Sequence, residues 1–331
     1  MTNKHAENII TTTLKKEWLK MTSAVAKVDN QAVEMINFAL VSKWIQFAQV
    51  SAASVRAYEK GIKRLKEYFT ARQIFKPTRA DLISYRDYLA GKYQPTTANL
   101  YITSAKLFFG FLEVEGYISN NPATHLKGLK VSTAHKKNAL SAEQTKAILR
   151  NFNTSTLAGK RDYAIYLLMT TCGLRCVEVQ RANISDLEKI DGVYRLRVQG
   201  KGRTQKDNFV NVPAGVYAAI SNYLKKRGGG DENAPLFASL SHRNFDGRLT
   251  TFSISRIIKN ALRENGLNSP RLTAHSLRHT TATTALKYGA SIREVQQLLR
   301  HTKIDTTCIY LHELDALKNQ ASTFAANAFG I

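Results

Sequence analysis

Several side chains that bind anions or carry protons gather in the last third of the sequence. His275 and Arg278 lie three residues apart, so they project from neighbouring positions at the start of a predicted helix. The positive end of a helix dipole favours an anion there, and a guanidinium fork matches two phosphate oxygens. Alone, such a pair in a basic protein is more often a surface feature than a site.

Further groups along the chain strengthen the interpretation as a site. Arg175 follows an apolar helix in the run Gly173-Leu174-Arg175, and Tyr310 comes nine residues after His301. A phosphodiester needs fixed positive charge where its transition state gathers negative charge, and arginines supply that charge. A tyrosine hydroxyl that attacks phosphorus conserves the bond energy in an ester, so rejoining would need neither ATP nor a metal.

This ordered set resembles the one in tyrosine recombinases of the phage integrase family, from about residue 35 to the end of the chain. The matching residues, in chain order, are Arg175, Lys201, His275, Arg278, His301 and Tyr310. Three departures stand beside the match, and one is that Cys176 and Val177 replace commoner small or aliphatic residues after the first arginine. Arg300 occupies a position where the family often has glycine, and Asn208 and Asn211 stand where basic residues are frequent.

The resemblance implies a role for each matching residue. Arg175 and Arg278 would contact the scissile phosphate, and Tyr310 would be the nucleophile. His275 would assist the tyrosine, and His301 would hydrogen-bond a non-bridging oxygen.

The leaving 5′ hydroxyl needs a proton, which the resemblance assigns to a hairpin lysine. Lys201, between two glycines, is the expected donor, and Lys206 is the alternative. Glu178 would support the region of the first arginine. No cofactor and no metal is implied. Taken singly, each residue has a structural interpretation: a surface arginine, a turn lysine, a helix cap, a core tyrosine. If all of these structural interpretations held, the order of the residues along the chain would be a coincidence.

Charge and composition favour a nucleic-acid partner. The 331 residues carry 48 Lys and Arg against 25 Asp and Glu, a formal net charge of +23. A hydrophobic content of 44% excludes a disordered chain. No apolar run is long enough to span a bilayer, and no secretion signal is evident, so we expect a cytoplasmic protein without membrane partners.

Three cysteines, Cys172, Cys176 and Cys308, form no closed disulfide framework, and we interpret the first two as small buried residues rather than metal ligands.

Two domains are expected around a basic linker. Residues 1–30 form a short extension, residues 31–124 a core DNA-binding domain of four helices, residues 125–139 the linker, and residues 140–331 the catalytic domain with a C-terminal tail helix. Capping boxes at Ser141 with Gln144 and at Ser291 with Glu294 predict two helix starts. Tyr194–Val198 and Phe209–Val212 predict a small antiparallel sheet. The expected class is mainly α (α+β), with a SAM-like N-terminal domain and the tyrosine-recombinase fold that the resemblance implies.

The predicted function is a site-specific recombinase that cleaves and rejoins DNA through a 3′-phosphotyrosyl intermediate and a Holliday junction, for integration, excision or resolution of a mobile element. The implied partners are double-stranded DNA with inverted-repeat core sites, a homo-tetramer, and accessory bending or directionality proteins. Alternatives are a type IB topoisomerase or telomere-resolving enzyme, and a catalytically silent DNA-binding protein. Base-reading candidates are Lys60, Lys63, Arg64, Arg256, Lys259 and Arg263. An apolar stripe from Leu314 to Ala325 predicts a tail that packs on its own domain or on a neighbouring protomer.

Overall fold

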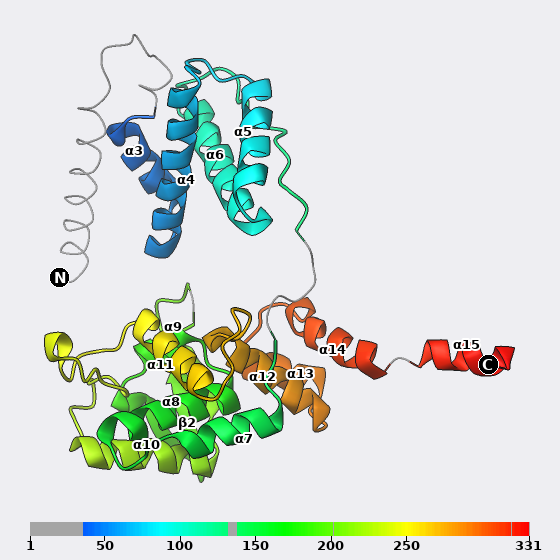
Figure 1. Ribbon diagram of the computed structural model, residues 1–331. Helices are drawn as coiled ribbons and strands as arrows, with labels where there is room; N and C mark the ends of the chain where they lie inside the picture. The colour runs from blue at the N-terminus through cyan, green and yellow to red at the C-terminus, as the bar shows by residue number, and fades with distance from the viewer. Residues whose placement is uncertain (1–35, 132–137, 201, 319, 331) are drawn as a thin grey trace. The chain divides into compact units, whose positions relative to one another are not determined.

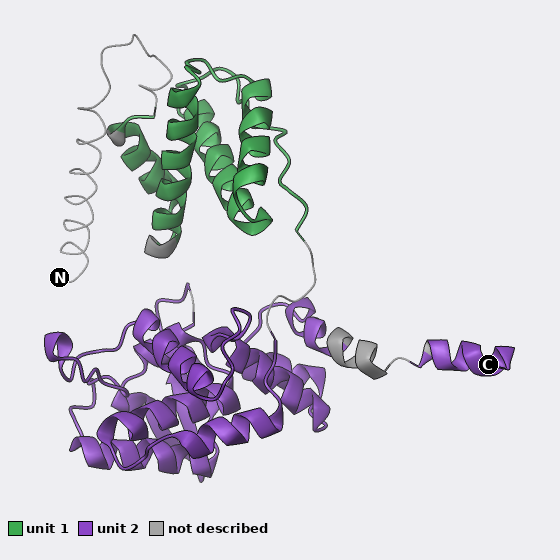
Figure 2. Cartoon of the chain, viewed as in Figure 1, with its two compact units in different colours: residues 1–133 green, residues 134–331 purple. Residues whose placement is uncertain are grey.

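The computed structural model describes residues 36–131, 138–200, 202–318 and 320–330. The predicted extension, residues 1–30, and the catalytic candidate Lys201 lie outside these ranges. The chain divides into two compact units, residues 1–133 and 134–331 (Figure 2). Every helix within the described ranges is too short or too polar to cross a lipid bilayer.

Unit 1 contains the four helices that the sequence predicted in its described part. They are α3 (Phe38–Ala48), α4 (Ala52–Ala71), α5 (Arg79–Lys92) and α6 (Pro95–Val114), labelled in Figure 1. Thr78 caps α5 and Asp81 caps it reciprocally, which satisfies two of the backbone N–H groups at the helix start. The buried core is aromatic, with Trp44 edge-on to Phe108 at 5.6 Å between ring centroids.

The beginning of the predicted linker is anchored to unit 1. Leu126 is buried in the core of this unit, and the Asn99 amide exchanges two hydrogen bonds with the backbone of Leu129, at 2.7 and 2.9 Å. Residues 132–137 lie outside the described ranges. On the far side, the backbone N–H of Leu140 donates to the Thr280 hydroxyl at 2.8 Å, which ties the chain to unit 2 at once.

Unit 2 is helical around a small sheet, as the sequence predicted. Its helices are α7 (Ala142–Asn151), α8 (Leu157–Cys172), α9 (Cys176–Arg181), α10 (Ala214–Arg227), α11 (Thr251–Glu264), α12 (Ala274–Lys287), α13 (Ile292–Leu299), α14 (Asp305–Lys318) and α15 (Ala321–Phe329). Two short 3-10 turns, η1 (Ile184–Asp186) and η2 (His242–Asn244), complete it. Both capping boxes form: Gln144 and Glu294 accept from the N–H groups of Ser141 and Ser291.

The sheet has three antiparallel strands in the order β1 (Leu187–Ile190), β2 (Val193–Val198) and β3 (Asn208–Asn211). Leu196 pairs with Leu187 on one side and with Val210 on the other. Leu196, Val198 and Val210 are buried in the main core of the unit. The sequence predicted strands β2 and β3 and their antiparallel pairing. β1 was not, because its four residues lack the alternation that marks a strand.

The end of the chain differs from the single tail helix that the sequence predicted. The apolar stripe from Leu314 to Ala325 falls on two helices, α14 and α15. A small cluster of Ala282, Val295, Leu299 and Tyr310 packs α14 against α12 and α13. In α15, by contrast, Phe324 and Phe329 are 67% and 76% exposed. Cys172 is buried and Cys176 half-buried, as expected for structural thiols, and burial raises the pKa of each well above its ordinary value.

Candidate active site

The loop that follows α8 creates the backbone of the site. Gly173 ends α8 in a left-handed conformation with φ of 61°. A Cβ at this position would lie 2.7 Å from the Cδ2 atom of Leu299, so glycine is required for space as well as conformation. The loop then places Arg175 at the N-cap position just before α9, and the Gly173 carbonyl accepts from Arg278 of α12.

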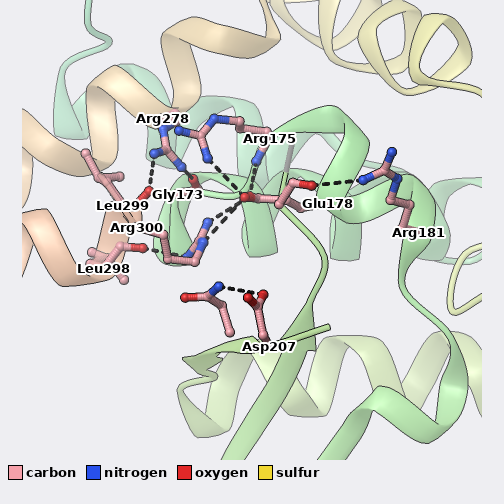
Figure 3. Close-up of polar contacts among 11 residues, drawn as sticks. Gly173, Arg175, Glu178, Arg181, Asp207, Arg278, Leu298, Leu299 and Arg300 are labelled. Carbon is pink, nitrogen blue, oxygen red and sulfur yellow. Dashed lines mark hydrogen bonds and ion pairs between the residues drawn. The ribbon is translucent and has the colours of Figure 1, made fainter. Parts of the chain in front are cut away.

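Arg278 joins three elements from the middle of the site. Its side chain, only 1% exposed, extends from α12, where Nη1 donates to the Gly173 carbonyl at 2.6 Å and Nη2 to the Leu299 carbonyl (Figure 3). Burial, together with the positive charges of Arg175 and Arg300, lowers the pKa of this guanidinium to about 9. It remains charged at neutral pH.

Glu178 is the carboxylate that the arginines share. It is buried, and it accepts from Arg175 twice: from the backbone N–H at 2.8 Å and from Nη1 at 3.0 Å. Arg300 donates to it through Nη2 at 2.7 Å (Figure 3). Burial alone would raise the pKa of the Glu178 carboxyl, but Arg300 and Arg175 together outweigh burial and lower it. Two guanidinium groups therefore contact this carboxylate and a third, that of Arg278, interacts with it electrostatically, which leaves an excess of positive charge.

His301 and Tyr310 lie beside this cluster. The Nδ1 atom of His301 is 2.9 Å from the Thr307 hydroxyl, and the His301 ring stacks toward Tyr310 with centroids 6.4 Å apart. Burial, together with the positive charges of Arg278, Arg175 and Arg300, lowers the pKa of His301 to about 4, so the imidazole is neutral at pH 7. The Tyr310 side chain is buried, and its phenol partly opposes the lowering of the Arg278 pKa.

The two histidines of α12 have different surroundings. His279 is buried, and its ring packs edge-on against Tyr310 at 5.0 Å between centroids, so its role in the structure is to support the tyrosine. His275 is exposed in the first turn of the helix, which Thr273 and Ser276 cap reciprocally. It is among the groups that lower the pKa of His301.

The hairpin between β2 and β3 borders a pocket that Arg175 and His301 also line. Lys201 is outside the described residues, but its neighbour Gly200 lines a hollow of about 360 Å³ together with Arg175, Glu178, Arg203, Asn208, Arg300, His301 and Thr302. Arg181 fixes the start of the hairpin by donating to the Gly200 carbonyl at 2.9 Å. Lys206, the alternative proton donor, is instead ion-paired with buried Asp186.

The candidate base-reading residues fall on two helices, α4 and α11. Lys60 is exposed, and Arg64 is paired with Glu67 at 2.6 Å. On α11, Arg256 and Arg263 are exposed. Lys259 donates to the backbone carbonyls of Ser269 and Leu272 at 2.8 and 3.3 Å, so it also orders the loop that leads into α12. A role of these residues in base contacts stays a prediction.

Sequence reasoning missed two residues of this region, Arg300 and Thr307. Arg300 was noted only as a departure from glycine, and its contact with Glu178 spans 122 positions in the chain. Thr307 is fully buried and contacts His301. Its spacing of six residues from His301, across the start of α14, is the one signal that could have pointed to it.

Two sequence profiles match the chain. The profile of the phage integrase family covers residues 138–316, and that of the phage integrase N-terminal SAM-like domain covers residues 44–116. The tyrosine recombinase XerD of Listeria innocua is 28% identical over 292 residues, which cover 84% of this chain and 92% of that protein. The tyrosine recombinase XerC of Leptospira interrogans is 31% identical over 290 residues, which cover 86% and 89%.

Solved structures show the same fold. The XerH site-specific recombinase bound to palindromic difH substrate has a TM-score of 0.70 and 19% identity, over 86% of this chain and 83% of that one. A lambda integrase dimer bound to a COC′ core site has a TM-score of 0.63 and 17% identity, over 80% of this chain and 95% of that one. At these identities the likeness is one of architecture.

Proposed function

The chain belongs to the phage integrase family and is a tyrosine-type site-specific DNA recombinase, and from that premise we propose how its residues divide the reaction. The observation that carries the proposal is the meeting of Arg175, Arg278, His301 and Tyr310 from two helices, α12 and α14, and two loops. A phosphodiester placed in the pocket would be stabilised by the positive charge of Arg175 and by a hydrogen bond from the neutral His301.

In the first step the Tyr310 oxygen attacks phosphorus and the bond from phosphorus to the 5′ oxygen breaks. The phenol proton passes to His275, and the 5′ oxygen takes a proton from Lys201. The product is a 3′-phosphotyrosyl ester with a free 5′ hydroxyl, so neither ATP nor a metal is consumed. Lys206 is a poorer donor than Lys201, since its ammonium is held by Asp186.

The arginines and His301 act on the non-bridging oxygens. Arg278 is held by two backbone carbonyls and Arg175 by one carboxylate, so both forks are oriented before DNA arrives. Because His301 is neutral, one of its ring nitrogens carries a proton. When Nδ1 accepts from Thr307, the proton is on Nε2, where it donates to a phosphate oxygen.

Rejoining reverses the same step with a 5′ hydroxyl from a second duplex. We propose that four copies act on inverted-repeat core sites through a Holliday junction, and that accessory DNA-bending or directionality proteins bias the outcome. The exposed Phe324 and Phe329 of α15 suit docking of this helix on a neighbouring copy. The biological role that we propose is integration, excision or resolution of a mobile element in the cytoplasm, with residues 31–124 as the core-binding domain.

The test uses nicked duplexes that trap the cleaved strand, drawn from a library that includes the flanks of the gene. We expect a protein–DNA adduct that survives denaturant with the wild-type chain and disappears in Tyr310→Phe, with binding retained. Tyr288→Phe, which removes a 73% exposed phenol, is the matched control and should form the adduct normally. Adduct formation by Tyr310→Phe, or its absence from the wild type across the library, would contradict the proposal.

A further inference from the structure

Arg300 is a third arginine in the site, at a backbone position that favours glycine. It ends α13 with φ of 54° and ψ of 46°, and its N–H caps the helix by donating to the carbonyls of Gln296 and Gln297. An L-residue in this left-handed conformation costs about 1–2 kcal/mol relative to the right-handed one. The sequence nevertheless places the largest cationic side chain here, so the side chain must offset that cost through its contacts.

Those contacts lie inside the site. The side chain of Arg300 is 8% exposed, and its Nη1 donates to the Leu298 carbonyl at 2.6 Å. Its Nη2 and Nε approach the two oxygens of Glu178 at 2.7 and 3.4 Å (Figure 3). Arg300 therefore faces the carboxylate with a fork, the arrangement that guanidinium and carboxylate groups prefer.

This arrangement leaves Arg175 with a single guanidinium bond to Glu178. A carboxylate next to one arginine normally accepts both of its parallel N–H groups. Here Nη1 of Arg175 reaches Glu178, and among the described residues its Nε and Nη2 make no hydrogen bond. The Arg175 side chain is 30% exposed, against 8% for Arg300, and both residues line the pocket of about 360 Å³.

We propose that Arg300 is a positioning residue: it occupies Glu178 so that the outer face of the Arg175 guanidinium stays open for the scissile phosphate. This inference rests on the proposed function of the site and assigns a role to a residue outside the six matched ones. Arg300 also adds positive charge behind the pocket. The charged or titratable groups that face Glu178 or Arg300 are Arg175, Arg278 on α12, His301, and the Cys172 thiol on α8.

Three variants separate this role from a merely structural one. Arg300→Met removes the charge and keeps the left-handed backbone, Arg300→Lys keeps the charge without the fork, and Arg300→Gly removes both the side chain and the backbone cost. Arg227→Met is the matched control, because Arg227 is equally buried, pairs with Asp246 and donates to a backbone carbonyl outside the site.

The first readout is the rate of adduct formation against pH, on a DNA that the wild-type chain cleaves. We expect Arg300→Met and Arg300→Gly to form the adduct at least about tenfold more slowly at pH 7. The acid limb of the profile, where the rate falls as the pH is lowered, should move to higher pH in both variants, since Glu178 loses its strongest cationic partner. Arg300→Lys should keep the acid limb near its wild-type place. Arg227→Met should destabilise the chain without moving that limb.

The second readout needs no DNA, so it distinguishes failure of this inference from failure of the proposed function. Without Arg300 the Glu178 carboxylate is buried beside one partner, and its protonation at low pH relieves that cost. The difference in melting temperature between the wild type and Arg300→Met should therefore be largest at pH 7 and shrink toward pH 4. An equal difference at every pH, or an Arg300→Gly variant with the wild-type pH profile of cleavage, would overturn the proposal.

Discussion

Replacing Glu178 by glutamine removes the negative charge that Arg175 and Arg300 share. In the wild-type chain this carboxylate accepts from Arg175 and Arg300 and is 1% exposed. Removing one partner of a buried ion pair costs about 3–5 kcal/mol, because it leaves uncompensated charge. The amide oxygen of glutamine still accepts one hydrogen bond, so we expect about 3 kcal/mol. For a unit of roughly 200 residues, that lowers the melting temperature by about 6–12 °C.

The pH dependence has a defined sign. Because the folded-state pKa of Glu178 is below its ordinary value of 4.5, its contribution to stability is complete above that value and is lost as pH falls through the folded-state pKa. The difference in melting temperature between wild type and Glu178→Gln should therefore be constant from pH 8 down to about 5 and close at more acid pH. Calorimetry of the full chain at a series of pH values measures it.

Glu188→Gln is the matched control for this experiment. Its carboxylate is 33% exposed and lies 3.7 Å from Arg197, a surface pair worth about 0–1 kcal/mol. Phosphate in the buffer should stabilise Glu178→Gln more than the wild type, since the variant has a larger excess of positive charge at the pocket. Equal melting temperatures of wild type and Glu178→Gln at pH 7, or a difference that persists unchanged at pH 3, would refute the reasoning.

Three further predictions concern the residues around the pocket. Thr307→Val keeps the side-chain shape but removes the hydroxyl next to Nδ1 of His301, so we expect a loss of about 1–3 kcal/mol and slower adduct formation; unchanged values of both would contradict this. Because the pKa of His301 is lowered to about 4, NMR of its ring nitrogens should show no titration between pH 5.5 and 8, and a midpoint near 6.5 would count against the site geometry. Gly173→Ala places a Cβ 2.7 Å from Leu299 at a positive φ, which should cost about 1–3 kcal/mol and displace the carbonyl that Arg278 binds. We expect both the melting temperature and the cleavage rate to fall. Wild-type values of both would disprove the close approach.

Local signals in the sequence predicted most of the helical framework. The capping boxes at Ser141 and Ser291 mark two helix starts, because in each a side chain three residues along the chain completes the cap. Such a signal lies within one short segment and can be read from the sequence. The matching residues of the site were found through their order along the chain. Their roles in the reaction stay predictions.

Contacts between distant segments could not be predicted in the same way. The link from Arg300 to Glu178 joins residues 122 positions apart, and no local pattern encodes it. β1 is short, and its pairing depends on Leu196 of β2 lying opposite Leu187. The division of the tail into α14 and α15 was hidden by an apolar stripe that runs through both helices.

The cover over Tyr310 has a kinetic consequence. Tyr310 is only 4% exposed, because from α14 it packs against Leu299 and Val295 of α13. We expect attack on phosphorus to require that packing to loosen, in which case the observed cutting rate would be the chemical rate multiplied by the fraction of molecules in an opened form. Each increment of about 1.4 kcal/mol spent on opening slows cutting tenfold. We therefore expect a copy that stays in the covered form to cut DNA slowly, and whatever stabilises the opened form to accelerate cutting.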